Sequence, residues 1–145
     1  MAGIFKAYDI RGTYPDQVNE EIAFKVGYHF SDLLDEEDLA RGPVVVVSRD
    51  MRSHSVPLAR ALARGLRARG VRVIDIGLAD TPLNYFATGY LAASGGIQVT
   101  ASHNPAVYNG FKMSRRDAIP VSRDTGIALL GNAVRLAPMH ARRRP

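Results

Sequence analysis

The sequence contains no cysteine, which excludes disulfide bonds and thiolate metal sites as a means of holding the fold together. It also lacks a long apolar run, since the strongest one, residues 44–47, is far too short to cross a bilayer. The amino terminus has no apolar core of the length that a signal peptide requires. We therefore expect a soluble, cytoplasmic chain with no membrane partner.

Aromatic residues are absent from the basic stretch at positions 142–144, which contributes to a net charge of +5. A basic surface attracts phosphate-bearing partners, whether nucleic acids or small phosphosugars. Proteins that bind single strands usually combine basic side chains with aromatic ones on which bases stack, and this stretch offers none. Terminal charge runs are usually only solvated, so we expect no nucleic-acid partner.

Neither an internal repeat nor a low-complexity linker divides the 145 residues. This length corresponds to about one domain, and the apolar fraction of 46% is that of an ordinary globular protein. We expect one domain over residues 1–137, followed by a flexible basic tail over residues 138–145.

Helical and strand-like patterns alternate along the chain, with short loops between them. Helices are predicted to begin at the caps Asn19, Ser55, Thr81 and Asp124. Strands are predicted over residues 44–47, 71–76, 97–99 and 111–113. The alternation predicts a three-layer α/β/α domain with a mixed, mostly parallel sheet and right-handed crossovers.

Ligands of such sheets bind beyond the carboxyl ends of the strands, and Ser102 lies in a loop that follows one of the predicted strands. A serine hydroxyl is a poor nucleophile without a base or a metal, but a phosphoserine stores a transferable phosphoryl group when cations surround it. The neighbouring His103 could bond phosphate oxygens, while Arg11 and Lys112 could neutralise charge. On composition alone, a serine–histidine pair in a loop is more often structural than functional.

Four landmarks occur in order along the chain. They are FKAYDIRG at residues 5–12, SRDMR at residues 48–52, TPLNYFA at residues 81–87, and TASHNP at residues 100–105 with YNGFK at residues 108–112. Together they resemble the signatures of the α-D-phosphohexomutases. The amino-acid sequence of the last landmark favours the phosphomannomutase/phosphoglucomutase branch. The resemblance covers nearly the whole chain and implies the amino-terminal domain of such an enzyme.

The resemblance implies roles for particular residues. Ser102 would carry the phosphoryl group and offer one oxygen ligand to Mg²⁺, with His103 beside it in the active site. Arg11 and Lys112 would contact phosphate and assist proton transfer, and Asn104 would share in binding phosphate. The parent reaction would move a phosphate between the 1- and 6-positions of a hexose phosphate.

Other polar residues of these loops are expected to have structural parts. Asp50 and Arg52 would brace the loops around the site. His54 stands where the family usually has a serine, and we interpret it as a tolerated loop substitution without a metal role. The acidic residues from Asp32 to Asp38 are expected to form solvated surface.

The sequence lacks the closely spaced aspartates with which the family binds Mg²⁺, and it lacks the family's sugar-reading and phosphate-gripping loops. Mg²⁺ requires octahedral oxygen ligands, which one serine cannot supply. We therefore expect a chain that is inactive alone and associates with the missing domains of the same enzyme, with a partner chain, or with itself. The alternative is a non-enzymatic module that binds phosphosugars or docks to a partner.

Overall fold

The computed structural model describes residues 2–136, and the predicted tail at residues 138–145 lies outside them. A 5-stranded sheet crosses this part of the chain in the order β1-β5-β4-β2-β3. The strands are β1 (Ile10–Thr13), β2 (Val44–Arg49), β3 (Arg72–Leu78), β4 (Gly95–Val99) and β5 (Tyr108–Arg115). Strand β2 pairs in parallel with β3 and β4, whereas β5 runs antiparallel to β4 and β1. The predicted α/β fold with a mixed sheet is confirmed.

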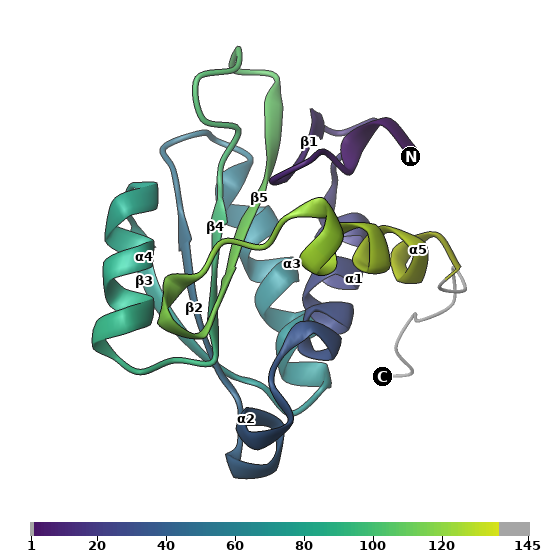
Figure 1. Cartoon of the computed structure of the whole chain (residues 1–145). Helices are drawn as coiled ribbons and strands as arrows, with labels where there is room; N and C mark the ends of the chain where they lie inside the picture. Colours follow the sequence, from purple (N-terminus) through teal and green to yellow (C-terminus); the bar gives the residue numbers. More distant parts are fainter. Residues whose placement is uncertain (1, 137–145) are drawn as a thin grey trace.

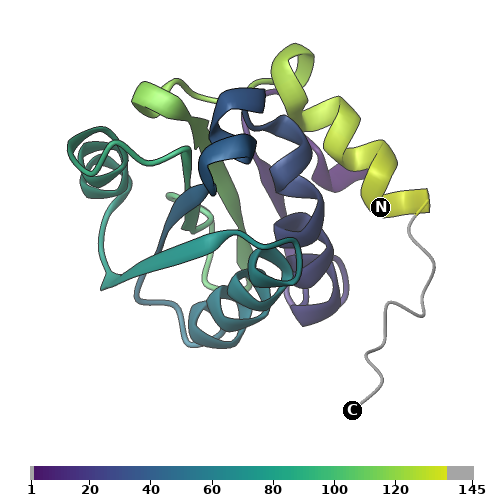
Figure 2. The same ribbon diagram turned by 90° about the horizontal axis from the view of Figure 1, so that it is seen from below.

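Helices cover both faces of the sheet, so the domain has three layers (Figures 1 and 2). On one face, α1 (Glu20–Phe30) and α3 (Ser55–Ala68) lie side by side, with α5 (Ala128–Leu136) next to α1. The opposite face is covered by α4 (Thr81–Tyr90). The short α2 (Glu36–Arg41) lies at the end of the sheet where β2 begins (Figure 1).

Helices α1 and α3 approach each other closely because each has a glycine at the crossing. A Cβ on Gly27 would lie 2.2 Å from the backbone oxygen of Leu62, and a Cβ on Gly65 would lie 2.1 Å from that of Phe24. No side chain larger than a hydrogen atom fits at either position without moving backbone, so this layer depends on both glycines.

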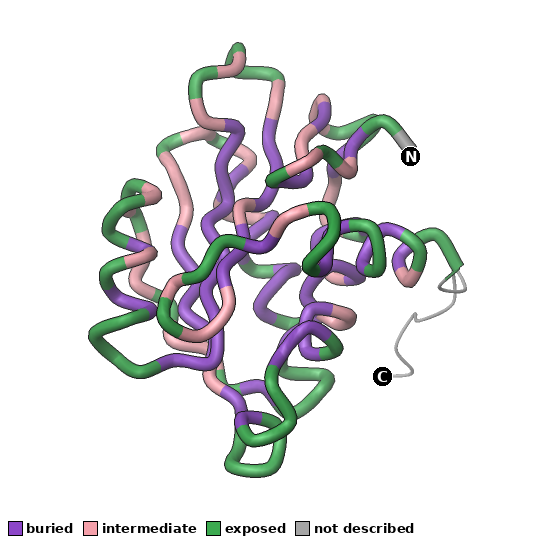
Figure 3. Tube along the Cα trace, in the orientation of Figure 1, coloured by how far each residue is buried: buried purple, intermediate pink, exposed green. Residues whose placement is uncertain are grey.

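Different kinds of contact bury the two faces of the sheet, and the central strand β4 is buried along its whole length (Figure 3). Beneath α1 and α3 lies the main apolar core, which includes the fully buried Phe30, Leu58, Leu62, Ile97 and Phe111. Beneath α4 the apolar cluster is small. There the Nδ2 of Asn84 donates a hydrogen bond to the hydroxyl of Ser48 at 2.7 Å, and Ser48 in turn bonds Gln98. Helix α4 is therefore held to the sheet by buried hydrogen bonds as well as by apolar contact.

One of the predicted helix caps is correct and another is displaced by one residue. Asn19 caps α1, since its Oδ1 accepts the backbone N–H of Ile22 at 3.0 Å. At α4 the cap is Asp80, not Thr81, because the Oδ1 of Asp80 accepts the N–H of Leu83 at 2.9 Å. A carboxylate at this position also favours the positive end of the helix dipole.

Two other predicted helix caps are wrong. Asp124 does not cap the last helix, because a π-helical turn precedes α5 and Ser122 and Thr125 exchange capping bonds there. Ser55 is the first residue of α3 and does not cap it, since its hydroxyl donates instead to the carboxylate of Asp50 at 2.6 Å. Both contacts are short-range, three residues apart for Ser122 and Thr125 and five for Asp50 and Ser55, and they take precedence over the predicted caps.

Two further expectations are corrected by long-range pairing. Strand β1 is not predicted from the sequence, because this short segment is ordered by its antiparallel partner β5. The acidic stretch is not uniformly solvated: Asp38 is 4% exposed and forms an ion pair with Arg116. Asp32, by contrast, is exposed and pairs with Arg69 at 2.7 Å.

The loops that form a candidate site meet at the carboxyl edge of the parallel strands. After β2, the N–H of Asp50 donates to the carbonyl of Val99, and after β3 the N–H of Ala79 donates to the carbonyl of Arg49, both at 3.0 Å. Strand β4 leads directly into residues 100–107, here called the Ser102 loop. Because β5 is antiparallel to β4, it begins at this same edge, where β1 ends. The topology thus places the Ser102 loop at the edge that the sequence predicts.

Candidate functional site

The backbone of Ser102 has a left-handed conformation, with φ of 56°. Residues other than glycine rarely adopt it, and it costs roughly 1 kcal/mol without local support. Here the backbone N–H of Ser102 donates to the Oγ1 of Thr100 at 3.0 Å, and the Thr100 hydroxyl donates to Asp50 at 2.8 Å. The orientation of Ser102 is therefore set by a chain of hydrogen bonds that ends on a carboxylate after β2.

Arg52 binds the Ser102 loop through its backbone. Its Nη2 donates to the carbonyl oxygens of Ser102 at 3.1 Å and Asn104 at 2.8 Å, and its Nη1 donates to that of Pro105 at 2.8 Å. Its Nε donates to Asp50 at 3.0 Å. Four of the five N–H groups that a guanidinium carries are used by these contacts. The geometry agrees with the interpretation that Asp50 and Arg52 brace the loops.

The carboxylate of Asp50 is the centre of this support. Its burial would raise its pKa, but hydrogen bonds from Ser55, Thr100 and Arg52 outweigh that effect, and the pKa is lowered from its ordinary value. Asp50 is therefore held in its charged form, as an acceptor for three side chains at once. A protonated carboxyl group could not accept all of these bonds.

His54 connects the loop after β2 to the Ser102 loop. Its Nε2 lies 2.9 Å from the carbonyl oxygen of Ala106, its Nδ1 lies 2.8 Å from the Nδ2 of Asn109, and its ring stacks on Tyr14 at 4.5 Å. A carbonyl can only accept, so Nε2 carries the proton and Nδ1 accepts from the amide. Both ring nitrogens are engaged in protein contacts, which agrees with a structural replacement.

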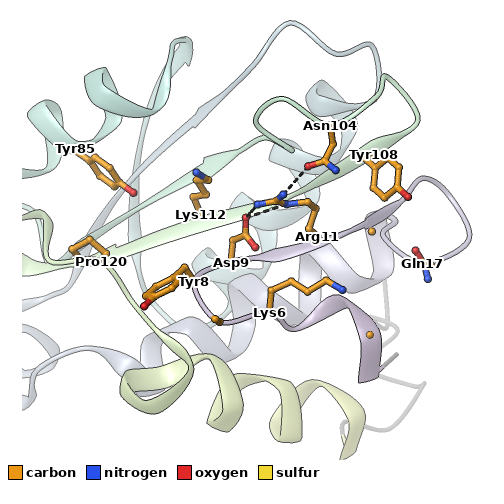
Figure 4. Close-up of a pocket in the computed structure, with 13 residues that line it drawn as sticks. Lys6, Tyr8, Asp9, Arg11, Gln17, Tyr85, Asn104, Tyr108, Lys112 and Pro120 are labelled. Carbon is orange, nitrogen blue, oxygen red and sulfur yellow. Dashed lines mark hydrogen bonds and ion pairs between the residues drawn. The ribbon is translucent and has the colours of Figure 1, made fainter.

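A pocket of about 730 Å³ opens beside β1 and β5 (Figure 4). Three cationic side chains line it, those of Lys6, Arg11 and Lys112, together with the carboxylate of Asp9. The lining therefore carries an excess of two positive charges. The remaining lining residues are Gly3, Ala7, Tyr8, Gly12, Gln17, Tyr85, Asn104, Tyr108 and Pro120. Cations, phenols and amides in one open cavity suit an anionic ligand with several hydroxyl groups.

Arg11 joins the two sides of this pocket. Its Nε donates to the carboxylate of Asp9 at 3.2 Å, its Nη2 also bonds Asp9, and its Nη1 donates to the Oδ1 of Asn104 at 2.7 Å. Figure 4 shows the guanidinium between these two partners, with Lys112 nearby. Asn104 belongs to the Ser102 loop, so Arg11 ties the pocket directly to that loop.

Tyr85 forms the wall of the pocket that comes from α4. Burial raises the pKa of this phenol, and the negative charge of Asp9 raises it further. Tyr85 is therefore neutral at physiological pH and able to donate a hydrogen bond to an anion.

The predicted site residues do not all occupy the same place. Arg11, Asn104 and Lys112 line the pocket, and two of them are hydrogen-bonded to each other. Ser102 is half-buried and His103 is exposed, and neither is among the described residues that line the pocket. The structure thus brings the phosphate-binding candidates together and places the serine–histidine pair in the adjoining loop.

Lys6, Asp9 and Tyr85 are among the pocket residues that receive no role from the sequence. Lys6 and Asp9 fall inside the first landmark, and Asp9 stands two residues before Arg11. In an extended segment, side chains two positions apart point to the same face, so this spacing is a signal for the pair. No sequence signal places Tyr85 and Asp9 in one pocket, because Tyr85 comes from α4 and Asp9 from the start of the chain.

Two properties of the described residues bear on metals and membranes. Among residues 2–136, no group of three or more histidine, cysteine or carboxylate side chains is arranged to hold a metal ion. These residues alone therefore do not fit Mg²⁺, which needs octahedral oxygen ligands. Over the same range, the longest and most apolar helices fall short of what a bilayer crossing requires.

Residues 2–133 match the family model for phosphoglucomutase/phosphomannomutase, alpha/beta/alpha domain I. Phosphohexose mutases from Xanthomonas campestris pv. campestris are 49% identical over 130 residues, which is 90% of this chain and 28% of the relative. A phosphomannomutase of Vibrio cholerae is 49% identical over 123 residues, 85% of this chain and 26% of the relative. A shorter phosphomannomutase of Klebsiella pneumoniae is 48% identical, and the match covers 74% of it.

Solved structures agree with the sequence matches. A phosphoglucomutase/phosphomannomutase family protein from Burkholderia thailandensis has a TM-score of 0.80 at 40% identity, over 92% of this chain and 30% of that one. A structure from Thermus thermophilus has a TM-score of 0.76 at 30% identity, over 92% of this chain and 29% of that one. The chain spans less than a third of the length of most of these relatives. It belongs to the phosphoglucomutase/phosphomannomutase family, and its fold is that family's α/β/α domain I.

Proposed function

We propose that this chain is the phosphoserine-carrying domain of a phosphohexomutase that acts on hexose phosphates. The observation that carries the proposal is the bond between Arg11 of the cationic pocket and Asn104 of the Ser102 loop. It places a serine in a tightly braced loop beside a cavity with an excess of two positive charges. Phosphoryl transfer depends mainly on positioning and on charge neutralisation, and the braced loop and the cationic pocket would each supply part of these.

In the proposed reaction, Ser102 donates its phosphoryl group to a hydroxyl at the 1- or 6-position of a hexose phosphate. The sugar oxygen bonds to phosphorus, the bond between phosphorus and the serine oxygen breaks, and the sugar's proton is released as Ser102 regains one. The resulting bisphosphate then returns its other phosphoryl group to Ser102. Arg11 and Lys112 neutralise phosphate charge, and Asn104 orients Arg11. His103, next to the serine, donates a hydrogen bond to the phosphate oxygens.

Mg²⁺ belongs to the complete site, where Ser102 would contribute one oxygen ligand and the metal would neutralise phosphate charge. Its other ligands have to come from beyond the residues described here, in keeping with the greater length of the relatives. The same holds for the parts that select the sugar. We therefore expect no measurable mutase turnover from the isolated chain, whose working partner is the rest of the enzyme or a chain that supplies it.

Intact-mass measurement tests the proposal. The purified chain is incubated with glucose 1,6-bisphosphate, with and without Mg²⁺, and we expect the mass of one phosphoryl group to be added. Ser102→Ala should abolish the addition, whereas Ser53→Ala, at an exposed position of the loop after β2, should leave it unchanged. An addition that survives Ser102→Ala, or none in the unmodified chain, contradicts the assignment of Ser102.

A second candidate is a non-enzymatic module that binds phosphosugars. The excess positive charge in the pocket favours it, because anion binding needs no metal. The same experiment separates the two functions. Binding of glucose 6-phosphate without any gain of mass from the bisphosphate would support the binding module, whereas a gain on Ser102 would support the mutase domain.

A further inference from the structure

The inference concerns Asp9 and rests on the proposed function, since it assumes that the pocket binds phosphate. Asp9 is 4% exposed, and it is the only carboxylate among the described residues that line the pocket. A buried negative charge beside an anion site is unfavourable on electrostatic grounds alone. We therefore ask which favourable interaction of Asp9 offsets this unfavourable charge.

Asp9 interacts with the guanidinium of Arg11. Its Oδ2 accepts hydrogen bonds from both the Nε and the Nη2 of Arg11, so the carboxylate binds one edge of the planar guanidinium. The opposite part of the group is held by Asn104, whose Oδ1 accepts from Nη1 at 2.7 Å. With two partners on different sides, the guanidinium has little freedom to rotate.

These bonds leave donors for a ligand. A guanidinium has five N–H groups, and the contacts with Asp9 and Asn104 use three of them. The rest remain available on a group that already lines the pocket, and Lys112 lies close by (Figure 4). A prepositioned arginine binds phosphate more tightly than a mobile one, because less rotamer entropy is lost on binding.

We propose that Asp9 is a positioning residue that, together with Asn104, presents Arg11 to a phosphate group of the ligand. Asp9 acts through Arg11 and does not touch the ligand itself. Since Asn104 is part of the Ser102 loop, the arrangement also links the orientation of Arg11 to the position of that loop.

Asp9→Asn tests the proposal because two possible roles of Asp9 predict opposite changes in the affinity for phosphate. Asparagine keeps an acceptor oxygen but removes one negative charge from the pocket and weakens the fork to Arg11. If Asp9 acts only through its charge, phosphate binds more tightly to the variant. If Asp9 positions Arg11, phosphate binds about tenfold more weakly, the loss expected when a charged hydrogen bond is impaired. The affinity is measured by nuclear magnetic resonance titration with inorganic phosphate and with glucose 6-phosphate.

The chain offers a matched control in the pair formed by Asp38 and Arg116. The side chains of Arg116 and Asp38 are 38% and 4% exposed, close to 30% and 6% for Arg11 and Asp9. Arg116 follows the end of β5 that pairs with the start of β4, at the edge opposite to the Ser102 loop. Asp38→Asn should therefore lower stability as Asp9→Asn does and leave the affinity for phosphate unchanged.

The outcomes distinguish phosphate binding by the pocket from the role of Asp9 in it. Absence of phosphate binding to the unmodified chain overturns the phosphate pocket and, with it, the role of Asp9. Normal binding to the unmodified chain with equal or tighter binding to Asp9→Asn overturns the role of Asp9 alone. If Asp9→Asn does not fold, Asn104→Ala decides, because it releases the other side of Arg11 at a half-buried position. Undiminished affinity in that variant contradicts the proposal.

Discussion

The Nη2 of Arg52 lies 3.1 Å from the backbone oxygen of Ser102, so a side chain that follows β2 holds the residue proposed to carry the phosphoryl group. The same guanidinium binds two further carbonyl groups of the loop and the carboxylate of Asp50. These contacts make Arg52 part of the loop's structure, although an arginine beside a phosphate site invites a ligand-binding interpretation.

Arg52→Ala should loosen the Ser102 loop and slow its phosphorylation. The change removes a charged donor from three backbone carbonyls and from the carboxylate of Asp50, and is expected to cost about 2 kcal/mol in the free energy of unfolding. Arg52→Lys should restore little, because an ammonium cannot reproduce the planar fork. Urea unfolding and the rate of mass gain with glucose 1,6-bisphosphate measure the two effects. Arg60→Ala, at an exposed position of α3, is the control, and equal behaviour of the two alanine variants would refute the brace.

The stability of the domain should fall in acid through Asp50. Its pKa in the folded protein is lowered, whereas the unfolded chain titrates near the ordinary value of 3.8. The stabilisation is therefore complete above that value and is lost as the pH falls through the lowered pKa of the folded state. Urea unfolding across this acidic range should show a shallower decline for Asp50→Asn than for the unmodified chain. Parallel curves for the two proteins would show that Asp50 is not responsible.

Glycine at the crossing of α1 and α3 should be indispensable. Gly65→Ala places a Cβ 2.1 Å from a backbone oxygen of α1 and should destabilise the domain by about 3 kcal/mol or more. Gly89→Ala, in α4, meets nothing within 4 Å and should stabilise it by about 0.5 kcal/mol through helix propensity. Thermal unfolding of both variants measures the difference, and a Gly65→Ala protein as stable as the unmodified chain would mean that the helices are farther apart.

The exposed face of α4 should promote self-association of the isolated chain. Phe86 and Tyr90 are 64% and 77% exposed, and their rings stack with centroids 5.5 Å apart. Exposed aromatic surface of this kind favours contact with another apolar surface. Sedimentation over a wide concentration range should show association that the double variant Phe86→Ser, Tyr90→Ser reduces. Leu129→Ser on α5, where Leu129 is 60% exposed, is the control. A monomer at every concentration would contradict the prediction.

The layered α/β architecture and the place of the Ser102 loop were predictable because they depend on local patterns. Apolar residues at helical spacing, β-branched runs and caps such as Asn19 act within a few residues of chain. The edge of the sheet at which a loop leaves its strand then follows from strand direction alone. The four landmarks likewise lie in contiguous segments, so the family could be identified without coordinates.

Only the tertiary structure decided which polar groups meet. The pairs that define the site join residues far apart in sequence, as when Arg11 meets Asn104 or Arg52 meets Ser102. The burial of Asp38 and the existence of β1 depend in the same way on a partner that local sequence does not name. Hydrogen bonds and ion pairs act over about 3 Å, so they exist only once the chain has folded and brought distant segments together.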